Sequence, residues 1–100
     1  MDHRFPNSNG TIYVDNGAAK ALSNGKSLLA AGITKIKGNF KKGENVIILD
    51  QNNIQLARGL SSFSSIEIDK IKGKQSKEID TILGYLSKTE VIHKDDMVLL

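Results

Sequence analysis

The sequence contains no cysteine and no tryptophan, and a single proline, in 100 residues. The absence of cysteine excludes disulfides, a thiol nucleophile and cysteine-ligated zinc or iron–sulfur centres. No apolar run is longer than four residues, so no segment has the length that a bilayer span requires. The first residues also lack the hydrophobic region of a secretory signal. We therefore expect a cytoplasmic location and no membrane partner.

The charge and apolar content are those of one small folded domain. Fourteen Lys and Arg against eleven Asp and Glu give a formal net charge of +3, and 39% of the residues are hydrophobic. Such a composition supports a modest core and argues against wholesale disorder. Residues 1–9 show no hydrophobic period, so we expect a disordered leader there, native or introduced for expression, ahead of one domain over residues 10–100.

The first third of that domain carries signals for a strand, a helix and a bent strand. β-Formers at residues 11–14 indicate a strand. Asp15 is placed to cap a helix, and Gly25 is placed to end it in the left-handed conformation. Residues 27–37 mix apolar residues with a glycine, which suggests an irregular or bent strand.

A hairpin is the clearest local pattern in the middle of the chain. Residues 46–49 are all apolar, and Asp50 follows them. This run predicts a strand over residues 46–50 that is buried on both faces. The asparagines of residues 51–53 are typical of a turn. Residues 54–60 then return as the partner strand, with Ile54 and Leu56 expected on one face.

Two short helices and two closing strands are predicted downstream. Ser64 and Glu67 have the spacing of a capping box, and the helix that they open ends at Gly73. Ser76 is placed to cap the next helix, and Gly84 is placed to stop it. The closing strands are expected at 91–92 and 97–100. This order predicts a mixed α/β domain that is mainly β, with too few helices to cover both faces of a parallel sheet.

Lysines gather in two segments that contain no acid. One segment, residues 23–43, holds Lys26, Lys35, Lys37, Lys41 and Lys42, and the other, residues 70–77, holds Lys70, Lys72, Lys74 and Lys77. Together they could form a phosphate-facing surface. The alternative is a set of solvated surface lysines, which the scarcity of arginine favours.

No catalytic constellation and no metal site emerge from the residue pattern. Gly25-Lys26-Ser27 has the last three letters of a phosphate-binding loop, but Lys20 stands where that loop needs glycine, so a turn is the simpler interpretation. Residues 93–96 place an imidazole next to two carboxylates. They form either a functional turn or a polar turn whose carboxylates cap backbone amides, and the other histidine, His3, lies in the leader.

Several motifs together resemble one known family. The run Gly-x-x-x-x-Asp-x-Gly-Ala starts at Gly10, and further matching segments follow. These segments are 25–33, 38–44, 57–60, 76–79, 82–85 and 91–97. Over residues 10–100 the sequence resembles the PUA domain at the C-terminus of bacterial glutamate 5-kinases. It departs from that pattern at Lys26, Ala30 and Lys94, where family members often have Ser, Pro and Arg.

The resemblance implies a fold and a parent activity. The fold is a PUA-type pseudo-barrel of mixed strands with short helices at its edges. The parent enzyme phosphorylates the γ-carboxylate of glutamate with ATP in proline biosynthesis, and its kinase domain holds ATP and magnesium. In that family the PUA domain is an accessory that tunes the kinase. We therefore expect no catalytic residue and no cofactor in this domain, and the kinase domain of the same polypeptide as its partner.

Two alternatives remain at this stage. PUA domains of RNA-modifying enzymes bind RNA, and Gly25 to Gly32 resembles their glycine-containing loop. In that hypothesis the RNA or phosphate contacts are Gly25, Lys26, Ser27, Gly32, Lys35, Lys37 and Lys72. A separate candidate is the functional turn of His93, Lys94, Asp95 and Asp96. The other alternative is a docking or self-association surface, to which Leu28, Leu29 and Phe40 would contribute if exposed.

Overall fold

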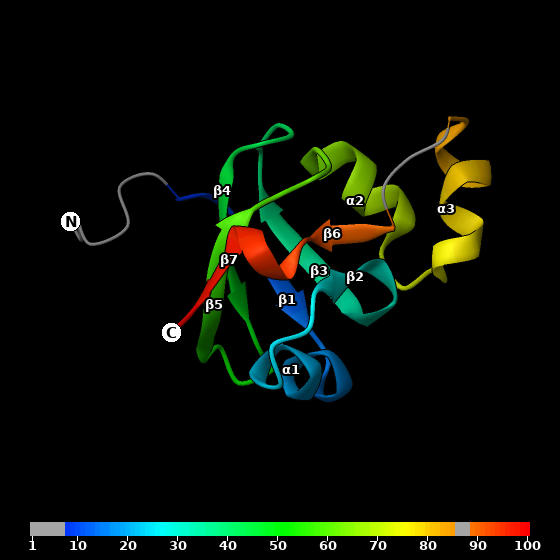
Figure 1. Ribbon diagram of the computed structural model, residues 1–100. Helices are drawn as coiled ribbons and strands as arrows, with labels where there is room; N and C mark the ends of the chain where they lie inside the picture. The colour runs from blue at the N-terminus through cyan, green and yellow to red at the C-terminus, as the bar shows by residue number, and fades with distance from the viewer. Residues whose placement is uncertain (1–7, 86–88) are drawn as a thin grey trace.

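The computed structural model describes residues 8–85 and 89–100, so expectations for residues 1–7 lie outside the described part. The elements in chain order are β1 (Ser8–Val14), α1 (Asn16–Ser23), β2 (Leu28–Leu29), the 3-10 turn η1 (Ala30–Gly32), β3 (Ile33–Gly38), β4 (Asn45–Leu49), β5 (Gln55–Leu60), α2 (Ser65–Ile71), α3 (Ser76–Leu83), β6 (Glu90–Ile92), the 3-10 turn η2 (Lys94–Asp96) and β7 (Met97–Leu99) (Figure 1). Because β1 starts at Ser8, residues 8 and 9 belong to a strand and not to the leader.

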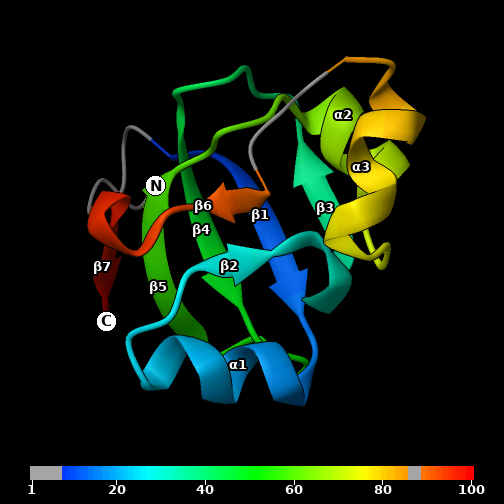
Figure 2. The same cartoon turned by 45° about the vertical axis from the view of Figure 1, so that its right-hand side comes forward.

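The strands form two sheets. The larger has the order β3-β1-β4-β5-β7, and the smaller pairs β2 with β6. The β1–β4 pair is parallel, whereas β1–β3, β4–β5, β5–β7 and β2–β6 are antiparallel. The small sheet lies in front of the large one, with α1 at one end of the large sheet and α2 and α3 beside β3 (Figure 2). The predicted mixed α/β, mainly β architecture is confirmed.

The core lies between the two sheets and follows from strand alternation. In β1, Ile12 and Val14 are fully buried, and in β4 Val46 and Ile48 are fully buried. Apolar residues of the smaller sheet, of the helices and of the loop before α2 join them in one cluster, among them Leu22, Leu28, Phe63, Ile68, Ile79 and Ile92. Leu28 and Phe40 belong to this core and offer no docking surface, whereas Leu29 is 43% exposed.

The predicted hairpin is present, but the predicted position of Ile54 is wrong. Asn53 adopts a φ of 63° in the turn, as asparagine tolerates. Ile54, however, lies before β5 and is 57% exposed, whereas Leu56 packs against the core. The two residues do not share a face, because Ile54 belongs to the turn, where its N–H donates to Asp50 Oδ1 at 3.0 Å. The register also shifts between Ile48 and Leu49.

The expected bent strand over residues 27–37 is two strands of different sheets. β2 pairs with β6, and β3 pairs with β1, and η1 makes the change of direction between them. The closing strands also separate, because β6 joins the small sheet and β7 the large one. Glycine and mixed periodicity signalled the irregularity, but not which partner each half would find.

The helix ends follow local chemistry closely. Asp15 Oδ1 accepts from Ala18 N at 2.8 Å and caps α1, and the Ser64–Glu67 capping box opens α2. Gly84 ends α3 with a φ of 81°. The cap of α3 is a correction: Gln75 is the extended N-cap residue and Ser76 the first helical one, because the Glu78 carboxylate accepts from Gln75 N at 2.9 Å. None of the helices described is long and apolar enough to cross a membrane.

Candidate functional site

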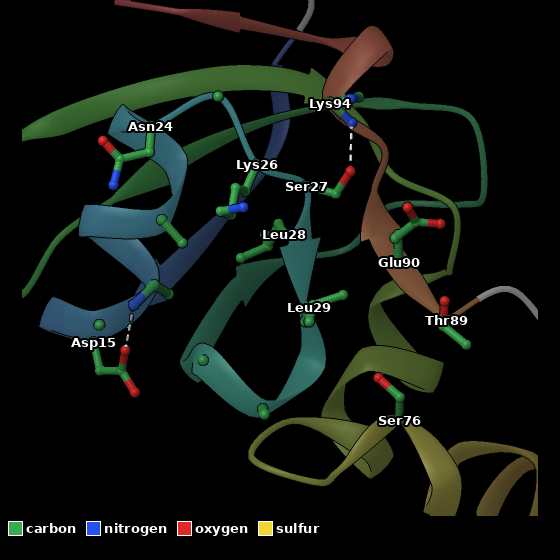
Figure 3. Close-up of a pocket in the computed structure, with 16 residues that line it drawn as sticks. Asp15, Asn24, Lys26, Ser27, Leu28, Leu29, Ser76, Thr89, Glu90 and Lys94 are labelled. Atoms are coloured by element: carbon green, nitrogen blue, oxygen red, sulfur yellow. Dashed lines mark hydrogen bonds between the residues drawn. The ribbon is translucent and has the colours of Figure 1, made fainter.

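A groove of about 860 Å³ lies where α1 and the loop after it approach the small sheet (Figure 3). Its walls come from α1, from the segment that continues through β2 and η1, and from the start of α3 together with β6 and η2. Its polar lining consists of Asp15, Asn24, Lys26, Ser27, Ser76, Thr89, Glu90 and Lys94. Leu28, Leu29 and several glycines and alanines form the apolar part.

Small residues allow α1 to pack closely against η1 at this groove. A Cβ on Gly32 would lie 2.4 Å from the Cβ of Ala18, so only glycine permits the observed approach. Asp15 N also donates to Gly32 O at 2.9 Å. The glycine that sequence analysis selected as a possible RNA contact therefore has a structural role: it sets the distance between two walls of the groove.

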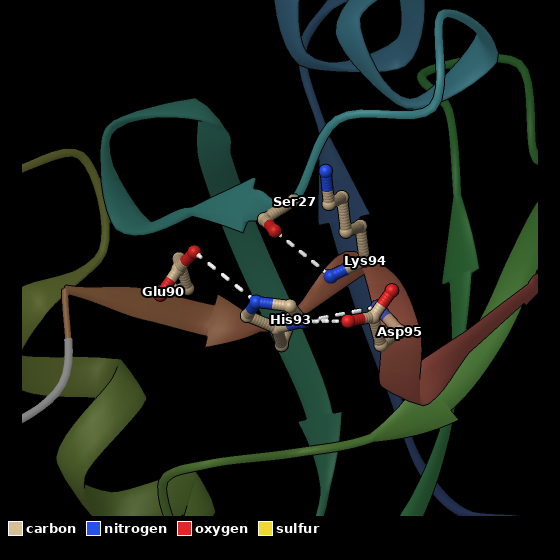
Figure 4. A network of polar contacts seen from close by, with 5 residues as sticks. All are labelled: Ser27, Glu90, His93, Lys94 and Asp95. Carbon is tan, nitrogen blue, oxygen red and sulfur yellow. Dashed lines mark hydrogen bonds and ion pairs between the residues drawn. The ribbon is translucent and has the colours of Figure 1, made fainter.

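One hydrogen bond joins two segments that are distant in the sequence. Lys94 N donates to Ser27 Oγ at 2.8 Å (Figure 4). It brings the Gly25-Lys26-Ser27 loop beside η2, so Lys26 and Lys94 both line the groove. Four of the seven proposed contacts, Gly25, Lys26, Ser27 and Gly32, thus meet one residue of the proposed functional turn.

The imidazole of His93 helps to hold the turn at residues 93–96. Asp95 N donates to His93 Nδ1 at 3.0 Å, so the ring caps η2. His93 Nε2 lies 3.9 Å from Glu90 Oε2, and Nδ1 lies 3.5 Å from Asp95 Oδ2. His93, Asp95 and Asp96 do not line the groove. This geometry gives His93 a positioning role: it fixes the backbone that presents Lys94 to Ser27.

The groove carries both signs of charge. Lys26 and Lys94 supply two cations, and Asp15 and Glu90 supply two carboxylates. One Asp15 oxygen is already committed to the α1 cap. Within residues 8–85 and 89–100, no group of three or more His, Asp or Glu side chains is placed to hold a metal ion. The groove therefore has the means to bind a polar or anionic ligand through lysines, backbone and hydroxyl groups.

The other lysines proposed as RNA contacts lie elsewhere. Lys35 and Lys37 on β3 place their Nζ atoms 4.5 and 5.7 Å from the ring centroid of Tyr13, and neither lines the groove. Lys72 pairs with Asp69 at the end of α2. Lys35, Lys37 and Lys72 therefore do not line the groove that the Gly25 loop borders, and their contact with RNA stays a prediction.

The rest of the second lysine segment surrounds a smaller hollow between α2 and α3. Lys70, Lys74 and Lys77 line about 530 Å³ there, together with Glu78, Thr81 and Ile82. The two lysine segments thus supply separate surfaces.

Sequence reasoning missed the residues that β6 and α3 contribute. Thr89 and Glu90 line the groove because β6 pairs with β2 across more than sixty positions of the chain, and Ser76 lines it from the start of α3. No local signal announces that pairing. The apolar pair Val91-Ile92, flanked by polar residues, was the one available hint.

Away from the groove, Tyr85 links the end of α3 to the start of α2. Its hydroxyl donates to the Glu67 carboxylate. Partial burial would raise the pKa of Glu67, but hydrogen bonds from Tyr85 and from Ser64 outweigh it, so the pKa of Glu67 is lowered. The same hydrogen bond to Glu67, with some desolvation, raises the pKa of Tyr85.

Comparison with known sequences identifies relatives over most of the chain. The sequence pattern described as the PUA domain matches residues 10–83. The glutamate 5-kinase of Pelagibacter ubique is 64% identical over 89 residues, which are 89% of this chain and 24% of that protein. The glutamate 5-kinase of Bartonella henselae is 48% identical over 90 residues, which are 90% of this chain and 24% of that protein. The chain thus spans about a quarter of the length of these curated relatives.

Solved structures share the fold. A PUA domain from Aeropyrum pernix K1, crystallised as a tartrate complex, superposes with a TM-score of 0.64 at 23% identity, covering 85% of this chain and 41% of that one. The archaeal box H/ACA sRNP Nop10–Cbf5 complex contains a chain with a TM-score of 0.60 at 24% identity, covering 83% of this chain and 24% of that one. These likenesses confirm the pseudo-barrel that the resemblance implied.

Proposed function

The chain belongs to the PUA domain family, and we propose that it is the accessory domain of a glutamate 5-kinase, without catalytic activity of its own. The observation that carries this proposal is the 64% identity over 89 residues to a quarter of one such enzyme. In this proposal the other three quarters supply the kinase domain, with its ATP, magnesium and glutamate sites. The parent enzyme transfers the γ-phosphoryl group of ATP to the γ-carboxylate of glutamate, the first step towards proline.

The groove presents two lysines and two carboxylates around an apolar floor. We propose that its role is to tune the kinase, including the kinase's response to proline.

The test is an assay of ATP-dependent glutamyl phosphate formation, trapped as the hydroxamate, for this chain and for its parent polypeptide. We expect turnover by the parent and none by the chain alone. Turnover by the chain would overturn the non-catalytic role. A coding region without a kinase domain would overturn the accessory role.

RNA binding is the second candidate function, and the clustering of Lys26, Ser27 and Lys94 in one groove favours it. One neighbouring structure is an H/ACA RNP bound to a substrate RNA. If the two lysines neutralise two phosphates of a single strand, the slope of log K against log salt should be about −1.4. Titration of a fluorescent 12-nucleotide RNA into the chain, repeated with K26A/K94A and the control K74A/K77A, tests this. A weak binding signal that changes neither with the salt concentration nor in either variant would reject RNA binding.

A further inference from the structure

The turn between β6 and β7 contains the one histidine of residues 8–85 and 89–100, His93. Its imidazole lies between the carboxylates of Glu90 and Asp95 (Figure 4). The side chain is 40% exposed, so solvent protons reach it. Imidazoles change charge between about pH 5 and pH 8. The turn that borders the groove therefore contains a group that can gain a proton in mild acid.

The hydrogen bonds of His93 define which ring nitrogen carries the proton in this structure. Asp95 N donates to Nδ1 at 3.0 Å, and a nitrogen that accepts carries no proton of its own. The proton of the neutral ring is therefore on Nε2, which lies 3.9 Å from Glu90 Oε2. In this form the imidazole caps η2. The turn seen here is thus the arrangement of the neutral ring.

A second proton on the ring removes this cap. Both nitrogens of an imidazolium are donors, so Nδ1–H and the Asp95 N–H would face each other. The nearest acceptor for the new N–H is Asp95 Oδ2, which lies 3.5 Å from Nδ1. The Nε2–H keeps Glu90 Oε2 as its partner. The charged ring therefore pairs with two carboxylates, whereas Asp95 N loses its acceptor.

These two carboxylates are the acceptors available to the charged ring. Among the described residues, no other carboxylate oxygen lies within 4.0 Å of either ring nitrogen. Asp96 is the remaining acid of η2. The surrounding cations are Lys94 on η2 and Lys26 on the facing loop, both of which line the groove, and the Lys94 side chain points away from the imidazole (Figure 4). β5 packs against the turn through Gly59, which has no charge.

The loss of the cap reaches the groove through the neighbouring amide. η2 has only three residues, and Asp96 N donates to His93 O at 2.8 Å to close it. Lys94 N, the amide next to that of Asp95, donates to Ser27 Oγ at 2.8 Å. A displacement of the Asp95 peptide therefore pulls on the bond that joins η2 to the loop after α1.

We propose that His93 is a proton switch at the edge of the groove. The neutral ring caps η2 and locks it against Ser27. The protonated ring pairs with Glu90 and Asp95 and releases Lys94 N from Ser27. Glu90 also lines the groove, so the same step draws one of the two groove carboxylates onto the imidazolium. Mild acid thus loosens one wall of the groove and makes its lining more positive.

The test is nuclear magnetic resonance of this chain, which carries its own core. Amide protection factors, corrected for the intrinsic effect of pH on exchange, are compared at about pH 8 and about pH 5. The protection of Lys94 and Asp95 should fall about fivefold in acid, which is the typical effect of losing one side-chain cap. The amides of β4 should keep their protection. The nitrogen shifts of the ring should place its proton on Nε2 at the higher pH.

Two matched variants assign the effect to His93. His93→Asn keeps a side-chain acceptor that caps well but does not titrate, so the protection of Lys94 and Asp95 should be the same at both pH values. His3→Asn removes the other histidine of the sequence and should leave the response of the unmodified chain unchanged.

Three results would overturn the switch. The first is equal protection of Lys94 and Asp95 at both pH values in the unmodified chain. The second is an acid response in His93→Asn as large as that of the unmodified chain. The third is a neutral ring whose proton is on Nδ1. The first and third are measured without any substitution, so they decide the matter even if His93→Asn does not fold.

Discussion

Gly32 is the residue whose lack of a Cβ matters most for the packing of the groove walls. A Cβ at this position would lie 2.4 Å from Ala18 Cβ, so Gly32→Ala forces α1 and η1 apart. We expect a loss of about 1–3 kcal/mol in the free energy of unfolding, which is typical of overpacking. Urea denaturation followed by circular dichroism measures it.

The control for this substitution lies in the neighbouring helix. Gly17 in α1 has its nearest neighbour, Asp15 Oδ1, at 3.5 Å from the added Cβ, so Gly17→Ala should stabilise by roughly 0.5–1 kcal/mol. The second-site change Ala18→Gly should recover most of the loss in Gly32→Ala. Equal stabilities of the Gly32 and Gly17 variants would contradict the proposed close packing.

Ser27 is the residue that ties the two lysine-bearing walls together. Ser27→Ala removes the acceptor of Lys94 N, and we expect it to lower the free energy of unfolding by about 0.5–1.5 kcal/mol. Amide hydrogen exchange should show Lys94 losing protection while the core strands keep theirs. Ser23→Ala, which removes an exposed hydroxyl that donates to Lys20 O of its own helix, should stay within about 0.5 kcal/mol. An unprotected Lys94 amide in the unmodified chain would be inconsistent with this bond.

Residue-level reasoning identified five of the sixteen residues that line the groove, namely Gly25, Lys26, Ser27, Gly32 and Lys94. Gly25, Lys26 and Ser27 were recognisable because glycine, lysine and serine occur in one short loop, and Lys94 because it sits in a charged turn. Sequence did not reveal that Lys35 and Lys37 lie outside the groove lining, because nearness in sequence does not show the side of a sheet. That side depends on alternation counted from Ile33, where the register shifts opposite Val14.

At the scale of elements, the link between α2 and α3 makes stability depend on pH. Glu67 has a lowered pKa in the folded chain because the hydrogen bonds from Tyr85 and Ser64 outweigh its desolvation. A lowered pKa means that its contribution is fully present above the ordinary carboxyl range and is lost as the pH falls through the folded value. Urea midpoints measured from pH 7 down to pH 3 should therefore fall, and Glu67→Gln should flatten part of that fall.

Tyr85 makes the stability depend on pH in the opposite direction. Its raised pKa means that its contribution is present below the ordinary tyrosine range and is lost as the pH rises through the folded value. Tyr85→Phe should thus reduce stability near neutral pH and should also weaken the acid dependence that Glu67 causes. If Tyr85→Phe left the acid limb unchanged, the Tyr85–Glu67 bond would have no part in it.

The elements differ in how far the sequence predicts them. Helix ends depend on hydrogen bonds within four residues, so Asp15, Ser64, Glu67 and Gly84 could be assigned from sequence, and only the cap of α3 moved by one residue. Strand pairing depends on residues far apart. The parallel β1–β4 pair and the β2–β6 pair left no local signal, so the division of strands between two sheets became visible only in the structure.

At the scale of the whole molecule, the two sheets share one core, and this predicts a single unfolding transition. Ile48 of the large sheet and Ile92 of the small sheet are both fully buried and belong to the same cluster. A two-stranded sheet such as β2–β6 has no independent stability, so it should unfold together with the five-stranded one. The family resemblance predicted this pseudo-barrel, whereas composition and periodicity indicated only a mixed α/β fold.

The measurement compares Ile48→Val with Ile92→Val, each of which removes one methylene from the core. Each should lower the free energy of unfolding by about 0.5–1.5 kcal/mol, with an unchanged urea dependence because the same surface is exposed on unfolding. Amide exchange of β4 and of β6 should then become faster together in both variants, because the two strands belong to one cooperative unit. Independent loss of protection in β6 alone on Ile92→Val would show instead that the groove, which β6 borders, opens without unfolding the large sheet.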